Sequence, residues 1–125
     1  MITLLKILVL LPGVAFLVTG LRWLVAPAGV APEVGLSLAS GIGLSSQSGD
    51  MSAFFLTLGI CILMGLVTGR KVWYYPAMTL LALTALGRTL AWLLHDAALA
   101  TSLIAPEVIV ALLLFFAARH LPDKA

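Results

Sequence analysis

Four long apolar stretches alternate with short polar segments along the chain. They run from Leu4 to Val25, Ser52 to Thr68, Val72 to Leu94 and Thr101 to Arg119. A helix that spans a bilayer needs about 20 mostly apolar residues, so each stretch is a candidate membrane span. The pattern predicts an all-α fold: an integral membrane four-helix bundle that forms one domain over residues 1–125.

Two of these stretches need a closer look. The first follows Lys6 and resembles a secretory signal, but its apolar run exceeds a signal core of about 7 to 15 residues, so we expect a membrane helix. The fourth contains Pro106, and a start at this proline would leave a helix of only about 21 Å. A start at Thr101 or Ser102, both suitable N-cap residues, restores the length needed to span.

The connection between the first two predicted helices, residues 26–49, is the one long loop. It is rich in Gly, Ser and Pro, and Glu33 is its only charged residue before Asp50. Its segment VGLSLASGIGL, residues 34–44, is too apolar for a free linker in water. We expect this loop to lie in the membrane interface or to fold over the outer end of the bundle.

The distribution of basic residues predicts the orientation. Of seven Lys and Arg residues, Arg22 flanks the outer side, Arg88 lies inside a span, and five flank the other side: Lys6, Arg70, Lys71, Arg119 and Lys124. Positive charge favours the cytoplasmic side, so both termini are predicted to be cytoplasmic. We therefore expect a multi-pass membrane protein. The aromatic residues expected at the two interfaces are Trp73, Tyr74, Tyr75, Trp23 and Trp92.

Composition narrows the classes of function. Hydrophobic residues make up 62% of the chain and charged residues 10%, far from the soluble average. A net charge of +2 is too small for a nucleic-acid footprint, so we expect no nucleic-acid partner. Cys61 is the only cysteine, which excludes an intrachain disulfide and a CxxC pair, and we expect no metal site.

Small residues mark faces on which the helices could approach closely. They are Gly13, Gly20, Gly59, Gly65, Ala77, Thr84, Gly87 and Ala91. Packing within the bundle or against another subunit would use the same residues, so a homo-oligomer and a membrane-complex partner both stay open.

Four ionisable residues are predicted in the outer third of the membrane. Arg88 lies about 10 Å from the outer end of the third helix, and Glu107 about 9 Å from the outer end of the fourth. Arg22 lies about 5 Å from the outer end of the first helix, and Asp50 begins the second. Because a charge within a bilayer is costly, we expect these side chains to form a functional polar cluster.

Further polar residues extend this cluster on the third helix. Thr84, Arg88 and His95 share one helical face, and His95 and Asp96 lie just above the cluster. Structural roles are the alternatives: ion pairs that hold the helices in register, basic side chains that reach out to water, acids at helix N-termini, and an interfacial turn at His95 and Asp96.

Four short motifs resemble those of a known family. They are GDMSAFFLTLG at the second helix, ALGR ending at Arg88, HD at residues 95–96, and PEVIVALLL around Glu107. The chain resembles, over nearly its whole length, a domain-of-unknown-function family of small bacterial four-helix inner-membrane proteins, DoxX-like in general architecture. The resemblance implies that the chain lies in a bacterial inner membrane and that Asp50, Arg88 and Glu107 occupy the positions of the family's polar residues. The family's basic residue just before Asp50 is missing here.

The hypothesis favoured by these observations is a binding or accessory membrane protein. Its outer-leaflet pocket, lined by Arg22, Asp50, Arg88 and Glu107, would hold a membrane lipid, a quinone or another amphiphile, with Arg88 contacting the head group. A DoxX-like redox or membrane-enzyme subunit is an alternative, but no cofactor or catalytic motif is present, which leaves the cofactor unknown and disfavours an enzyme. A small transporter and a structural subunit of a membrane complex are further alternatives.

Overall fold

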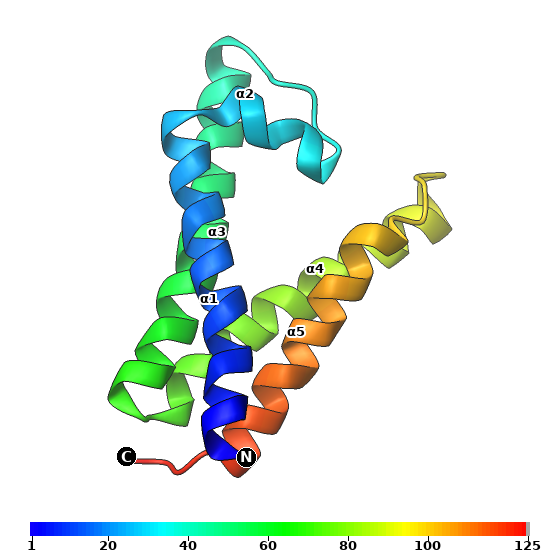
Figure 1. Ribbon diagram of the computed structural model, residues 1–125. Coiled ribbons are helices and arrows are strands. Elements are labelled where there is room, and N and C mark those ends of the chain that lie inside the picture. The colour runs from blue at the N-terminus through cyan, green and yellow to red at the C-terminus, as the bar shows by residue number, and fades with distance from the viewer. Residues whose placement is uncertain (125) are drawn as a thin grey trace.

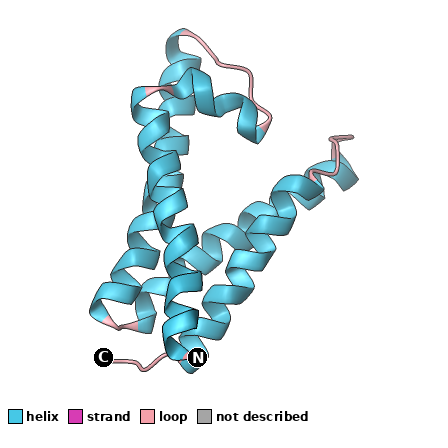
Figure 2. Ribbon diagram, in the orientation of Figure 1, coloured by secondary structure: helices cyan, strands magenta, loops and turns pink. Residues whose placement is uncertain are grey.

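The computed structural model describes residues 1–124 and consists of helices joined by short connections (Figures 1 and 2). The elements, in chain order, are α1 (Ile2–Val25), α2 (Pro27–Val30), the 3₁₀ turn η1 (Ala31–Val34), α3 (Gly41–Thr68), the 3₁₀ turn η2 (Lys71–Trp73), α4 (Tyr74–Leu94) and α5 (Thr101–His120).

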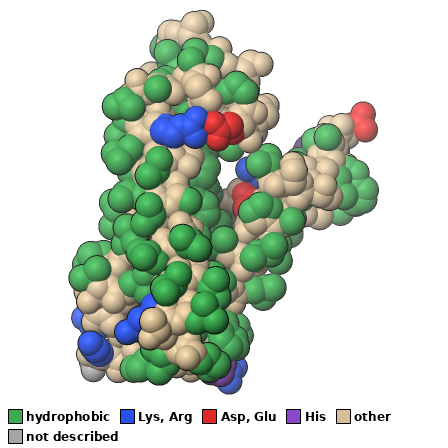
Figure 3. All heavy atoms as spheres, in the orientation of Figure 1, with side chains coloured by type: hydrophobic (Ala, Val, Ile, Leu, Met, Phe, Trp, Pro, Cys, Tyr) green, Lys and Arg blue, Asp and Glu red, His purple; other side chains and the backbone are tan. Residues whose placement is uncertain are grey.

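Four of these helical segments are long and apolar enough to cross a membrane: α1, α3, α4 with η2, and α5. Large apolar side chains cover much of the outer surface, as Figure 3 shows; Leu11 is 62% exposed, Ile109 63% and Leu112 63%. Such a surface suits hydrocarbon and not water. The predictions of an all-helical fold and of four candidate spans are confirmed, and the predicted start of the last helix at Thr101 is correct.

The long helices form two pairs that diverge (Figure 1). We name α1 with α3 the first arm, and α4 with α5 the second arm. The arms meet at the end that carries Lys6, Arg70, Lys71, Arg119 and Lys124, which we name the basic end; the other is the far end. Burial follows this shape, because the buried residues of the second arm lie in its basic-end half or, for Ala85, one residue past the midpoint of α4: Tyr74, Ala77, Leu81, Ala85, Leu114, Ala117 and Ala118.

Glycines bring the backbones of α1 and α3 together. A Cβ added at Gly59 would lie 2.7 Å from the backbone nitrogen of Leu17 and 2.9 Å from the carbonyl oxygen of Gly13. A Cβ at Gly20 would lie 2.8 Å from the backbone nitrogen of Leu56. Since lipid chains are as apolar as the side chains, such close contact is a main source of helix association in a membrane.

The helix predicted to begin at Ser52 begins eleven residues earlier, at Gly41, which corrects the predicted boundary. Its 28 residues extend for about 42 Å, more than a hydrocarbon core of about 30 Å. The added turns contain Ser45, Ser46, Gln47 and Gly49, so an apolar pattern could not reveal them. Gln47 stabilises this region, since its side chain accepts a hydrogen bond from the backbone N–H of Ala39 and donates one to the carbonyl of Ser37.

The predicted long loop is therefore shorter than expected and partly helical. Its first half forms α2 and η1, which fold over the far end of the first arm (Figure 1). Val30 and Ala31 are almost completely buried there, beside a fully buried Trp23. Trp23 was expected at the interface, and its burial is explained by this cover. The hydroxyl of Ser48 donates to the carbonyl of Trp23 and ties α3 to the end of α1.

We predict that Gly59→Ala destabilises the protein and that the matched variant Gly87→Ala does not. The new methyl at position 59 would collide with backbone atoms of α1, and such overpacking costs about 1–3 kcal/mol. A Cβ at Gly87 would meet nothing within 4 Å, and alanine is the better helix former by about 1 kcal/mol. Thermal unfolding of both variants in the same detergent measures the difference, and equal melting temperatures would contradict the proposed contact.

Candidate functional site

Arg88 of α4 and Glu107 of α5 form an ion pair. The Nε–H of Arg88 is shared between the two carboxylate oxygens, at 3.1 Å from Oε1 and 3.2 Å from Oε2. The side chains are 27% and 12% exposed, respectively. The two residues were expected at equal depth on neighbouring helices, and their contact confirms that part of the prediction.

The pair lies well inside the apolar part of the second arm. Arg88 is 14 residues from the start of α4, and Glu107 is 13 residues from the end of α5, so both lie about 20 Å along their helices from the basic end. This far along a membrane-spanning helix, an isolated charge would have a high free-energy cost. Pairing cancels the net charge and gives the carboxylate a donor.

A cavity of about 120 Å³ borders the pair between the two arms. Figure 3 shows the hollow that separates the arms, with acidic and basic atoms on its walls. Apart from Arg88 and Glu107, every residue of the lining is apolar: Phe16, Val34, Phe54, Phe55, Leu81, Leu103 and Pro106. The cavity therefore combines one polar wall with an apolar remainder, and its lining comes from α1, η1, α3, α4 and α5.

The guanidinium of Arg88 is only partly used by Glu107. Its contact runs through Nε, and within residues 1–124 no hydrogen bond involves its Nη1 or Nη2. A guanidinium carries five N–H donors, so four remain for another acceptor. Phosphate, carboxylate and carbonyl oxygens all match this donor edge.

Arg22 is not part of this site. It pairs with Glu33 of η1, with its Nη2 2.5 Å from Oε2 and its Nη1 3.1 Å from Oε1, and it also donates to the carbonyl of Gly29. Arg22 was expected to line the outer pocket, but it does not line the cavity beside Arg88. It forms a local ion pair at the far end of the first arm. The reason is the turn through α2 and η1, which brings Glu33 back over the end of α1.

The structure places the other four residues of the predicted cluster away from the ion pair or in local contacts. Asp50 is exposed on α3 and takes part in no salt bridge within the described residues, because it belongs to the first arm while Arg88 belongs to the second. The hydroxyl of Thr84 donates to the carbonyl of Leu80 in its own helix. His95 and Asp96 are exposed where α4 ends, and Asp96 has a left-handed backbone with φ 56°.

Aromatic residues of the lining were missed in the sequence. The Phe54 and Phe55 rings lie 5.1 Å apart edge to face, and the Phe55 and Phe16 rings stack at 6.0 Å. The adjacent pair at 54 and 55 was the available signal, but a hydrophobic pattern does not tell a cavity wall from ordinary core. Within residues 1–124, no group of three or more His, Cys, Asp or Glu side chains could hold a metal ion.

The Arg22 pair predicts a pH dependence of stability. Hydrogen bonds from the guanidinium lower the pKa of Glu33 below its ordinary value of 4.5, although desolvation opposes part of this shift. A lowered folded-state pKa gives stability that is present above the ordinary pKa and lost as pH falls through the folded-state pKa. We expect the melting temperature of the wild type to fall more than that of Glu33→Gln between pH 5 and pH 3. Parallel curves would exclude the contribution.

The Arg88 pair predicts strong coupling in a double-mutant cycle. Arg88→Met and Glu107→Leu each leave one unpaired charge at a partly buried site, and we expect each to cost about 3 kcal/mol of unfolding free energy. The double variant should be far closer to the wild type than the sum, because it leaves no charge behind. Unfolding in detergent measures all four proteins. Additive losses would show that the two side chains act independently.

Comparisons with protein-family models, with curated proteins and with solved structures find no match to this chain. The resemblance to the DoxX-like family therefore stays a prediction, and the functional argument depends on the geometry of the site.

Proposed function

We propose that this chain is a binding or accessory protein of a bacterial inner membrane that holds an amphiphile, such as a lipid or a quinone, between its two arms. The polar head of the ligand would accept hydrogen bonds from Arg88. Its apolar part would lie against the phenylalanines and Leu103 and continue into the surrounding membrane.

One observation carries this proposal: a guanidinium with unused donors on the wall of an otherwise apolar cavity. An ion pair that served only to join α4 to α5 could lie in a closed contact between them. This pair instead borders a space that is also lined by residues of α1, η1 and α3. Ligand sites typically combine mostly apolar walls with a few placed polar groups.

The size of the cavity limits which part of the ligand it can enclose. Its volume of about 120 Å³ is smaller than the roughly 300–1,000 Å³ of a site that surrounds a whole small molecule. A head group or a single ring fits this volume, while an attached chain would extend between the arms. The proposed ligand is therefore an amphiphile with an acceptor-rich head.

The placement of charge supports the proposed orientation. Lys6, Arg70, Lys71, Arg119 and Lys124 all lie at the basic end, which also carries the N-terminus. The positive-inside rule assigns that end to the cytoplasm. The cavity would then lie in the outer leaflet, about two-thirds of the way across from the cytoplasmic side.

We predict that filling the cavity releases a bound amphiphile. Leu103→Trp adds a large ring to the lining without removing either charge, whereas Leu112→Trp adds the same ring on an exposed, lipid-facing position of α5. Native mass spectrometry of proteins purified in mild detergent should show an amphiphile adduct on the wild type and on Leu112→Trp. The adduct should be lost from Leu103→Trp and from Arg88→Met.

The same experiment can contradict the proposal. If the adduct survives in both Arg88→Met and Leu103→Trp, the cavity does not hold it. If no variant and no wild-type preparation carries an adduct after incubation with lipid and quinone extracts, the ion pair has a structural role only.

A further inference from the structure

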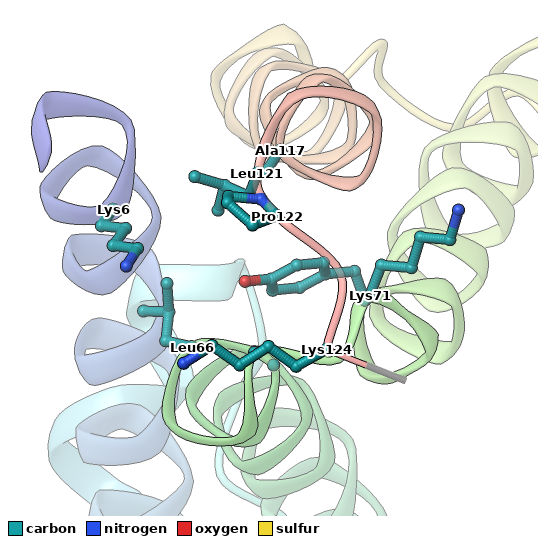
Figure 4. A pocket seen from close by; sticks show the side chains of 10 residues that line it. Lys6, Leu66, Lys71, Ala117, Leu121, Pro122 and Lys124 are labelled. Atoms are coloured by element: carbon teal, nitrogen blue, oxygen red, sulfur yellow. The ribbon is translucent and has the colours of Figure 1, made fainter. Parts of the chain in front are cut away.

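A second pocket lies at the basic end and shares no lining residue with the cavity (Figure 4). Its volume is about 50 Å³, and its walls come from α1, α3, α4, α5 and the segment after α5. The lining residues are Lys6, Gly65, Leu66, Gly69, Lys71, Tyr74, Ala117, Leu121, Pro122 and Lys124. Three of these ten residues are lysines.

The segment after α5 is bound in place and completes this pocket. The backbone N–H of Lys124 donates to the carbonyl of Gly69 at 2.8 Å. The carboxylate of Asp123 accepts a hydrogen bond from the backbone N–H of Lys71 at 3.3 Å, and it lies 4.0 Å from the Lys71 ammonium. The pocket wall is thus held by specific contacts on both sides of the turn between α3 and α4.

The three lysines of the pocket differ in their partners: Lys71 is paired with Asp123, and the other two have no salt-bridge partner in the described part of the chain. In Figure 4 the ammonium groups of Lys6 and Lys124 lie on the same side of the pocket, although they come from opposite ends of the chain. The ammonium of Lys71 points away from them, and its charge is offset by Asp123. Within residues 1–124 neither Lys6 nor Lys124 forms a salt bridge. Among the described residues, two positive charges without a salt-bridge partner therefore border one small pocket.

Tyr74 adds an unused hydrogen-bond donor. The residue is only 2% exposed and lines the pocket, yet within the described residues its hydroxyl makes no hydrogen bond. The ring is fixed against α3, because a Cβ at Gly65 would lie 2.7 Å from the Tyr74 Cζ. Among the described residues the one buried side-chain polar atom without a partner is Trp23 Nε1, so the Tyr74 hydroxyl is not sealed in the core: it is accessible and can donate to a ligand in the pocket.

We propose that this pocket binds the phosphate group of an anionic membrane lipid, with Lys6 and Lys124 neutralising the charge and the Tyr74 hydroxyl donating a hydrogen bond. Phosphate oxygens are acceptors only and match two ammonium groups and one hydroxyl. Basic pockets between membrane helices are a known means of holding anionic head groups.

The size of the pocket suits a phosphate group, and its apolar surroundings favour a lipid phosphate over a free phosphate ion. One water molecule needs about 10–15 Å³, so about 50 Å³ holds a phosphate-sized group and no acyl chain. Exposed apolar residues surround this end, among them Leu4 at 59% and Val67 at 81%, and acyl chains can lie against them. The site is separate from the cavity bordered by Arg88 and does not depend on the function proposed for it.

Lipid binding by charge-matched variants tests this proposal. The full chain, purified and delipidated, is titrated with phosphatidylglycerol in mixed micelles and followed by native mass spectrometry. The double variant Lys6→Gln with Lys124→Gln should bind phosphatidylglycerol about tenfold more weakly. The control pair Arg70→Gln with Arg119→Gln removes the same charge from the same end but lies outside the pocket, and it should retain wild-type affinity.

Two further measurements separate the remaining explanations. Tyr74→Phe keeps the ring against Gly65 and deletes only the hydroxyl, so it should fold normally and bind phosphatidylglycerol several-fold more weakly. The tenfold difference should persist when the lysine variant and its parent both carry Leu103→Trp, which fills the cavity, so the loss would be assigned to the pocket and not to the cavity. Equal losses in the lysine and arginine pairs, or no loss in either, would overturn the site. Displacement of the lipid by an equal concentration of inorganic phosphate would overturn the lipid assignment.

Discussion

The arrangement of this protein depends on the close contact between the backbones of α1 and α3. In hydrocarbon the apolar side chains gain nothing by leaving the solvent, so helices associate where their surfaces approach most closely. Gly13, Gly20 and Gly59 provide such an approach along the first arm. The second arm has no equivalent contact with the first at the far end, since Gly87 faces open space. The arms therefore pack together at the basic end and diverge beyond it.

This divergence makes the Arg88 and Glu107 pair possible in its present form. A guanidinium sealed between four tightly packed helices would need acceptors for all five of its N–H groups. Here Glu107 satisfies Nε, and the remaining donors border a cavity. Because the two charges neutralise each other, the energetic cost of placing them in an apolar region is reduced. The opening between the arms leaves space for a ligand that accepts hydrogen bonds from the remaining N–H groups of Arg88.

The four candidate spans and the matched positions of Arg88 and Glu107 along their helices could be predicted from the sequence, because both follow from local rules. Helix rise and the length of apolar runs suffice to place Arg88 beside Glu107. The same rules fail at Gly41, where eleven residues of α3 are too polar or too flexible to be recognised as a continuation of a span. Once the helix begins there, Asp50 becomes an exposed position on the first arm and not the start of a helix beside Arg88.

The partner of Arg22 could not be predicted for a related reason. Glu33 reaches it only because α2 and η1 reverse the chain, and η1 ends at Gly35 with a left-handed backbone that glycine accommodates readily. A turn of this kind depends on cover by Val30 and Ala31 against the core, which is a tertiary effect. The predicted depth of Arg22 grouped it with Arg88 and Glu107, whereas in the structure it pairs with Glu33.

Both candidate sites consist of residues from both arms. For this reason no short sequence motif contains either site. The cavity needs Phe16 and Phe55 from the first arm to face Arg88 of the second. The pocket at the basic end is lined by both Lys6 and Lys124, although these residues lie near opposite ends of the chain. Neither helix pair contains a site by itself. What the chain can bind is therefore determined by how the arms are joined at the basic end, where Tyr74 packs on Gly65 and the last described residues bind the α3 to α4 turn.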